Sequence, residues 1–306
     1  MASTTTGSPA LLTEVYLPGV TEVFYANSAM FDVFPKIMNP VNSSITWAMV
    51  NEGTNYAATT SEGGSAPSAN VRSDIKLAVS KQAFQVVSEV THELQYQSDP
   101  SKISDVWADT LSKDARLLAD IINTTLLSTF ESAIAATGSY GGQTRTSYSD
   151  GLVSYASSTT KALSVDDIET MVRTLIDANR GVRRSDLMIF ASPTLVSQYA
   201  KASNNSFDAV RQQIRMQGDK VDGGYGVGSG VTHDGIPFVA MAEMTATSVI
   251  CGPQLNPEFR GEIHVSRDIS ISPLGKVARA DRALIDADMQ FICKAPGKWG
   301  VLTNRS

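Results

Sequence analysis

The chain has few of the residues on which metal and redox chemistry in proteins usually depend. Its 306 residues include two cysteines and three histidines. Cys251 and Cys293 lie far apart and form no CxxC or Cys/His pattern, so the sequence indicates neither a zinc site nor a disulfide framework. We expect two reduced thiols that pack as small apolar residues. His92, His233 and His264 also lack the spacing of metal ligands, so we expect each to be solvated or locally hydrogen-bonded.

Long apolar runs and export signals are also missing. No segment approaches the roughly 18 uninterrupted apolar residues that a bilayer-spanning helix needs. The segment 1–9 (MASTTTGSP) has no basic region followed by an apolar stretch, so no signal peptide is indicated. The sequence therefore predicts synthesis and residence in a cytoplasm, without a membrane partner.

None of the short motifs typical of common catalytic sites is present. There is no Gly-x-Ser-x-Gly elbow, no His-Glu-x-x-His and no Walker motif. The acidic pairs Asp166-Asp167 and Asp286/Asp288 suit helix capping and the solvent face of a strand better than catalysis. The glycine-rich segment 223–230 (GGYGVGSG) has neither the Gly-Lys-Ser/Thr nor the following helix of a phosphate loop, so we interpret it as a flexible turn. We therefore expect no enzyme activity and no cofactor.

Basic charge is scarce where a nucleic-acid binder would need it. Lys and Arg number 25 against 31 Asp and Glu, which gives a net charge of −6. Among the first forty residues only Lys36 is basic, whereas Glu14 and Glu22 are acidic. A protein that condenses nucleic acid by charge normally carries a basic arm. The sequence therefore argues against electrostatic binding, and any nucleic acid nearby must be confined in another way.

The first ninety residues indicate an extended arm followed by two strands. Residues 1–40 carry a short helical patch at 20–31. Such a segment cannot bury its apolar side chains alone, so we expect it to lie across other parts of the fold or across a neighbour. Apolar residues then alternate in two runs, which predicts two antiparallel strands: Ile45, Trp47 and Met49, then Ile75, Leu77 and Val79. The intervening segment 51–70 is almost wholly Gly, Ser, Thr, Ala and Asn. It is either a floppy surface loop or a long hairpin that becomes ordered against another subunit, and its length favours the second interpretation.

A long amphipathic helix is the clearest element of the sequence. Asp99-Pro100 suits an N-cap and a first helical residue. Apolar residues follow at a period near 3.6, and Gly138 is a natural C′ residue. A helix over 100–137 would contain about 38 residues and measure about 57 Å. The alternative is two helices with a break near 112–114.

The second half of the chain mixes helices and strands. Ser164 to Asp167 resembles a capping box that starts a second amphipathic helix, and Ser192-Pro193 starts a third. Further strands are predicted at 187–191, 236–241, 263–271, 279–292 and 297–302. The last three fit a sheet that closes the fold at the carboxyl end. The fold class is therefore α+β.

This order of elements resembles the Hong Kong 97 fold of the major capsid proteins of tailed double-stranded DNA bacteriophages, over nearly the whole chain. No short diagnostic motif carries the resemblance. The local likenesses are Trp47 with Glu52-Gly53, 81–94, 114–130, 186–199, Gly235-Ile236-Pro237 and 277–301.

The resemblance implies an N-terminal arm, a long loop called the E-loop, a peripheral P-domain with a spine helix, and an axial A-domain. Mapped onto this chain, the expected ranges are 1–40 for the arm, 41–88 for the E-loop, 89–150 with 252–294 for the P-domain, and 151–251 with 295–306 for the A-domain. It also implies self-assembly into pentamers and hexamers, a shell that encloses double-stranded DNA without sequence-specific binding, and a place in the virion after assembly in the host cytoplasm. Scaffolding, portal and cement or decoration proteins are the expected partners. The arm in this sequence is not preceded by the long charged helical scaffolding segment that some members of the family have, so we expect a separate scaffolding protein or none.

The residues that we expect at contacts between subunits lie in two glycine-rich loops and beside them. They are Trp47, Tyr56, Glu62, Arg72, Lys76, Gly224, Tyr225, Gly226 and Gly228. Two other functions stay open. One is an encapsulin-type nanocompartment shell around a cargo enzyme, and the other is a cytoplasmic α/β enzyme that uses the glycine loop at 223–230.

Overall fold

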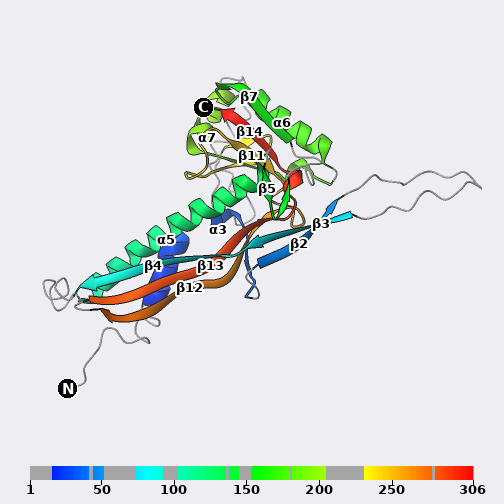
Figure 1. Cartoon of the computed structure of the whole chain (residues 1–306). Helices are drawn as coiled ribbons and strands as arrows, with labels where there is room; N and C mark the ends of the chain where they lie inside the picture. The colour runs from blue at the N-terminus through cyan, green and yellow to red at the C-terminus, as the bar shows by residue number, and fades with distance from the viewer. Residues whose placement is uncertain are drawn as a thin grey trace, which may run out of the picture.

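The computed structural model describes residues 16–40, 44–51, 73–91, 103–135, 138–144, 153–179, 181–204, 231–277 and 280–305. They form an elongated lower lobe, an upper lobe that stands over one end of it, and a two-stranded hairpin that leaves from the same end (Figure 1). The expected helix start at Asp99-Pro100 and the glycine loop at 223–230 lie outside the described residues. Within the described residues, no helix is both long enough and apolar enough to cross a membrane.

A single helix, α5 (Ile103–Ile134), forms the length of the lower lobe. It has 32 residues and no break at 112–114, so the two-helix alternative is wrong. Its buried residues recur every three or four positions, as an amphipathic helix requires. The helix ends before Gly138, which has a φ of +108° but lies four residues beyond the last helical residue. The expected C′ role of Gly138 is therefore wrong.

The lower lobe also contains a four-stranded sheet and two short helices. In spatial order the strands are β1 (Lys36–Met38), β12 (Gly261–Val277), β13 (Ala280–Cys293) and β4 (Gln82–Thr91). Helix α5 packs against β13 and β4. The chain segment before β1 forms α2 (Leu17–Ala26) and α3 (Ala29–Val33), and α2 packs against α5 and β12. The helical patch expected near residues 20–31 is thus present, and it is covered by the chain's own fold.

The upper lobe is built on a six-stranded sheet. Its strands in spatial order are β7 (Val153–Lys161), β14 (Gly300–Arg305), β11 (Val249–Gly252), β8 (Met188–Ala191), β10 (Ile236–Ala240) and β9 (Thr232–His233). The lobe also contains α6 (Val165–Ala178), α7 (Pro193–Asn204) and the short 3₁₀ helix η4 (Arg184–Asp186). The capping box is confirmed, because the Ser164 hydroxyl accepts from the Asp167 backbone N–H while the Asp167 carboxylate accepts from that of Ser164.

The last three strands do not form the single closing sheet that the sequence predicted. β12 and β13 are long antiparallel partners in the lower lobe, whereas β14 pairs with β7 and β11 in the upper lobe. The 3₁₀ helix η5 (Pro296–Lys298) redirects the chain between the two sheets. Trp299 follows it and is fully buried, so burial of this large side chain helps to fix the change of direction.

One hydrophobic core runs through both lobes. Phe34, Phe130 and Phe291 of the lower lobe pack with Phe190 and Trp299 of the upper lobe, with ring centroids 5.0–6.0 Å apart. A second, smaller core lies within the upper lobe. The lobes therefore share their largest aromatic cluster and do not meet across a thin interface.

Asp286 departs from its expected place on the solvent face of a strand. Its side chain is only 6% exposed and pairs with Arg267 at 2.5 Å, and it also accepts a hydrogen bond from the Ser270 hydroxyl. Register shifts in β12 on both sides of Arg267 bring this residue opposite Asp288 and its guanidinium within reach of both aspartates. Asp288 stays partly exposed.

The two cysteines are free thiols in the buried part of the fold. Both are fully buried, Cys251 in the upper-lobe core and Cys293 in the shared core. Burial raises the pKa of Cys251 to about 12, so its thiol is protonated at neutral pH. Both positions match the expectation of small apolar packing residues.

Candidate assembly site at the base of the hairpin

The hairpin that projects from the lower lobe consists of β2 (Ser44–Asn51) and β3 (Ser73–Ser80). The two strands are antiparallel, with Trp47 opposite Leu77 and Met49 opposite Ile75. All six apolar residues predicted for these strands are at least partly buried, whereas the alternate positions with a described side chain are exposed. The two strands and their apolar face are therefore confirmed.

Two of the expected contact residues, Trp47 and Lys76, lie within the described part of the hairpin. They are on adjacent strands but differ in burial, because Trp47 is half-buried and Lys76 is exposed. The other seven residues lie outside the described residues and stay predictions: Tyr56, Glu62, Arg72, Gly224, Tyr225, Gly226 and Gly228.

Trp47 contacts this chain's own lower lobe. Its indole N–H donates to the backbone carbonyl of Lys294 at 3.1 Å, and its ring centroid lies 6.0 Å from that of Tyr140. The Tyr140 hydroxyl in turn accepts from the backbone N–H of Cys293 at 3.0 Å. Trp47 therefore anchors the base of the hairpin to the end of β13.

A short turn that the sequence reasoning missed supports the other side of the hairpin. It consists of β5 (Ser139–Tyr140) and β6 (Gln143–Thr144), joined by Gly141 and Gly142. Both glycines have positive φ, +61° and +80°, as a two-residue hairpin of type I′ requires. The Gly-Gly pair was the sequence signal for this turn, but it lay within a segment rich in Gly, Ser and Thr.

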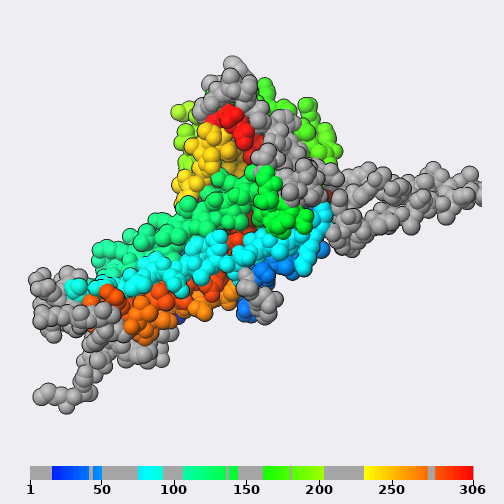
Figure 2. Space-filling view, in the orientation of Figure 1, coloured from blue at the N-terminus to red at the C-terminus, as the bar shows by residue number. Residues whose placement is uncertain are grey.

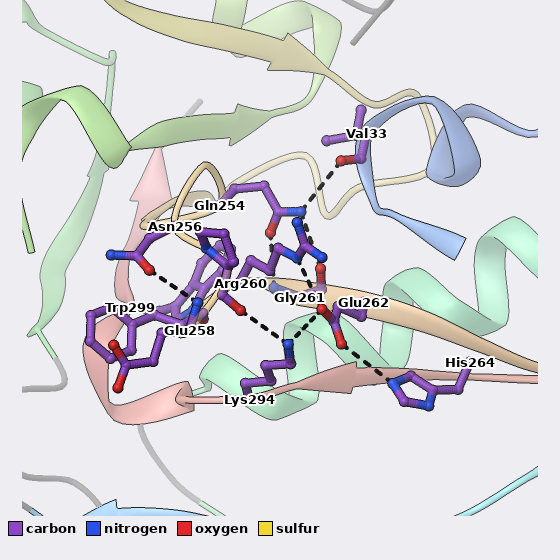
Figure 3. Close-up of polar contacts among 12 residues, drawn as sticks. Val33, Gln254, Asn256, Glu258, Arg260, Gly261, Glu262, His264, Lys294 and Trp299 are labelled. Carbon is purple, nitrogen blue, oxygen red and sulfur yellow. Dashed lines mark hydrogen bonds and ion pairs between the residues drawn. The ribbon is translucent and has the colours of Figure 1, made fainter. Parts of the chain in front are cut away.

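Lys294, whose carbonyl accepts the Trp47 hydrogen bond, also belongs to a polar cluster centred on the buried Glu262 (Figure 3). The Glu262 side chain is 1% exposed, and its carboxylate accepts from Arg260 at 2.9 Å and from Lys294 at 2.6 Å. His264 lies 3.4 Å away on the other carboxylate oxygen. Burial by itself would raise the pKa of Glu262, but hydrogen bonds from His264, Lys294 and Arg260 outweigh it and lower the pKa to about 2. Glu262 is therefore ionised at neutral pH and holds Lys294 in place.

Gln254 ties the same cluster to the N-terminal part of the chain. Its side-chain amide donates to the backbone carbonyls of Val33 and Gly261, while its oxygen accepts from the Gly261 N–H at 2.9 Å (Figure 3). Gln254 is fully buried, so these bonds satisfy its polar atoms. The end of α3, the start of β12, the end of β13 and the hairpin thus meet at one junction. The charged groups of this junction are paired with one another, which suits a structural role.

A second polar cluster lies in the upper lobe, around the buried His233. Its ring nitrogens lie 2.6 Å from the Tyr199 hydroxyl and 2.8 Å from the Glu169 carboxylate. Arg184 pairs with both Glu169 and Asp234 at 3.0 Å. Burial lowers the pKa of His233 and outweighs the opposite influence of Glu169 and Asp234. Burial would also raise the pKa of Glu169, but hydrogen bonds from Arg184 and His233 lower it.

Three donors of this second cluster are the group within the described residues that best resembles a metal site. One ligand atom from each of Glu169, His233 and Asp234 lies within 4.8 Å of the others. The guanidinium of Arg184 already pairs with both carboxylates, so a divalent cation would have to displace it. The geometry therefore favours a network of ion pairs over a metal centre.

Comparison with known proteins identifies the fold. No protein-family model and no curated protein sequence matches the chain. Among solved structures, the capsid asymmetric unit of cyanophage A-1(L) has a TM-score of 0.63 and 12% identity, and the match covers 90% of this chain and 92% of that one. A virus-like particle from Pyrococcus furiosus has a TM-score of 0.58 and 11% identity, covering 95% and 98%. The mature capsid of bacteriophage PhiM1 has a TM-score of 0.57 and 11% identity, covering 92% and 86%.

These matches define the class of fold to which the chain belongs. The chain has an α+β fold like that of the Hong Kong 97 major capsid proteins. The resemblance drawn from the order of elements in the sequence is therefore confirmed at the level of the fold.

Proposed function

We propose that this chain is the major capsid protein of a tailed double-stranded DNA virus, which assembles into pentamers and hexamers of an icosahedral shell. The observation that supports the proposal is the fold, which is shared with a phage capsid over about nine tenths of both chains. In this proposal the chain assembles in the host cytoplasm and resides in the virion, and its function is structural, not enzymatic.

We also propose how the expected domains correspond to the observed sheets. We assign the lower lobe with α5 as the P-domain and its spine helix, the upper lobe as the A-domain, and β2–β3 as the described part of the E-loop. Pairing of β14 with β7 supports including residues 295–306 in the A-domain. β4 begins at Gln82 within the lower-lobe sheet, so we place the end of the E-loop at Lys81, earlier than the predicted residue 88.

In this proposal DNA is held by confinement within a closed shell. A subunit with a net charge of −6 repels phosphate on average, and each added copy increases that repulsion. The enclosed genome therefore needs no sequence-specific contact with the chain.

The first prediction is that the purified protein forms capsomers or closed particles visible by negative-stain electron microscopy. Particles from infected cells should contain double-stranded DNA that is protected from nuclease. A strictly monomeric protein at high concentration by light scattering would contradict the proposal.

A shell that encloses a protein cargo, as in encapsulins, is the second candidate. One of the matched structures is described as a virus-like particle, and it covers 95% of this chain. Purified particles that contain a single enzyme and no DNA would favour this candidate over a virus capsid.

A further inference from the structure

The turn formed by β5 and β6, residues 139–144, lies directly against the hairpin strand β3. The backbone N–H of Ala78 donates to the carbonyl of Gly141 at 2.9 Å. Two residues earlier on β3, the carbonyl of Lys76 accepts from the side-chain amide of Gln143 at 3.3 Å. β3 pairs with β2 along one side, so the turn supplies these hydrogen bonds along its other side. In the space-filling view the turn (green) packs against the cyan surface of β3 and β4 (Figure 2).

The contact between the turn and the hairpin leaves no room for a side chain at residue 141. A Cβ atom at this position would lie 2.9 Å from the Leu77 Cβ and 3.2 Å from the backbone nitrogen of Ala78. Leu77 itself is fully buried, so it cannot swing aside into solvent. A Cβ atom at the neighbouring Gly142 would meet nothing within 4 Å. The close approach of two backbones therefore depends on Gly141 specifically.

The hairpin base is thus held from two directions. Gly141 and Gln143 hold the edge of β3, and Tyr140 and Lys294 hold the Trp47 side chain of β2. A small rotation at such a base has a larger effect further out. The described ladder ends at Asn51, four residues or about 13 Å beyond Trp47, so a rotation of about 10° at these contacts would move that end by about 2 Å, and a longer hairpin by more.

We propose that the turn at 139–144 is a positioning element that sets the direction in which the hairpin leaves the molecule. It thereby selects the surface of a second copy of this chain that the hairpin contacts. Gly141 permits the close approach, and Tyr140 and Gln143 are the positioning side chains. This inference rests on the proposed function, because the direction of the hairpin matters only if neighbouring copies assemble around it.

The test compares Gly141→Ala with Gly142→Ala. Both substitutions place a side chain at a positive φ and carry similar backbone strain, but only the first also forces the turn and the hairpin apart. We expect Gly142→Ala to form wild-type particles. We expect Gly141→Ala to give a several-fold lower yield of closed particles or a shifted distribution of diameters in electron micrographs.

A second readout uses the unassembled subunit. Hydrogen exchange at the Ala78 amide should be several-fold faster in Gly141→Ala than in Gly142→Ala, because only Gly141→Ala breaks the bond to the Gly141 carbonyl. Tyr140→Phe and Gln143→Ala provide milder variants if Gly141→Ala fails to fold. Each removes one hydrogen bond of the turn, so each should shift the particle distribution in the same direction.

The possible failures can be told apart. If the wild-type chain forms no particles, the proposed function fails. If the wild type forms particles and Gly141→Ala, Tyr140→Phe and Gln143→Ala all match Gly142→Ala in yield and diameter, the positioning role of the turn is overturned while the proposed function stands.

Discussion

At the scale of single residues, the buried carboxylate of Glu262 holds the hairpin junction together. Its partners are Arg260, Lys294 and His264, and the Lys294 backbone also receives the Trp47 hydrogen bond. Glu262→Gln should destabilise the unassembled subunit by about 2 kcal/mol. This is less than for a fully buried pair, because the Lys294 side chain is about one-third exposed. Urea denaturation of the two proteins measures the difference.

Glu258→Gln is the matched control for this prediction. The substitution is the same, but Glu258 is exposed and its carboxylate makes none of the bonds of the Glu262 cluster. Its effect should stay within about 0.5 kcal/mol, as for most surface substitutions. Equal losses in the two variants would show that the Glu262 ion pairs contribute nothing to stability.

His233 makes the stability of the upper lobe depend on pH. Burial lowers the pKa of His233 in the folded chain, whereas in the unfolded chain the pKa lies near 6.5. Below about pH 6.5 the unfolded chain therefore binds a proton that the folded chain does not, until the pH falls past the lower folded pKa. His233 therefore contributes its full share to the free energy of unfolding above about pH 6.5. This contribution declines as the pH falls from about 6.5 towards the lower folded pKa.

We predict that the thermal midpoint of the unassembled subunit falls more between about pH 7.5 and about pH 5.5 in the wild type than in His233→Gln. The glutamine can still hydrogen-bond but does not titrate, so the difference between the two proteins isolates the histidine from the carboxylates. Parallel pH profiles would mean that the folded pKa of His233 is not lowered.

At the scale of elements, the base of the hairpin packs against its own subunit. The tip, by contrast, is proposed to contact a neighbouring subunit in the shell. Asn51 and Ser73 are the last described pair of the ladder. Replacing 52–72 by Asn-Gly would close the strands with a type I′ turn at that pair. We predict an unchanged midpoint of unfolding for the subunit and weaker or absent shells, measured by thermal denaturation and electron microscopy.

A second variant of the tip tests whether assembly depends on the length of the loop or on its side chains. A Gly/Ser segment of the natural length in place of 52–72 keeps the reach of the loop but removes Tyr56, Glu62 and Arg72. If this variant assembles normally, those three residues make no essential contact. If the Asn-Gly variant also forms shells of wild-type stability, the tip has no role in assembly.

The elements that the sequence predicted well are those with a local pattern. The alternation from Ile45 to Met49, the helical stripe of α5 and the capping box at Ser164 each depend on neighbours in sequence. The missed features depend on residues far apart in the chain. Trp47 bonds to Lys294, and Gly141 meets Leu77, so neither contact leaves a periodic signal.

Two predictions about the strands, the exposure of Asp286 and the single closing sheet, were wrong for the same physical reason, which is tertiary packing. Asp286 is covered because a register shift in β12 brings Arg267 over it, and β14 changes sheets because Trp299 is buried in the shared core. Strand periodicity predicts which faces alternate, but partner strands and bulges are decided by tertiary packing.

At the scale of the whole molecule, the two lobes are joined by one hydrophobic core that contains buried residues of both. Phe130 at the end of α5 contacts Phe190 and Trp299 of the upper lobe at 5.3–5.4 Å between centroids. The carboxylate of Glu131 also accepts from the backbone and hydroxyl of Thr245 at 2.8 Å. A core shared in this way favours cooperative unfolding of the lobes as one unit.

The three tryptophans of the chain allow this prediction to be tested, because each lies in a different place. Trp107 is buried on α5, Trp299 is buried where the lobes meet, and Trp47 is half-buried at the hairpin base. Three variants should each retain one tryptophan, with the other two changed to phenylalanine. Urea unfolding of the unassembled subunit is then followed by fluorescence and, in the same variant, by far-ultraviolet circular dichroism. Comparing the two probes within one variant removes any change in stability that the substitutions cause.

We predict that the fluorescence and circular dichroism midpoints coincide for Trp107 and for Trp299, since both side chains belong to the shared core. For Trp47 the fluorescence midpoint should lie at lower urea, because the hairpin is held only at its base and can separate before the core opens. A Trp299 transition that precedes that of the backbone would show that the lobes part first.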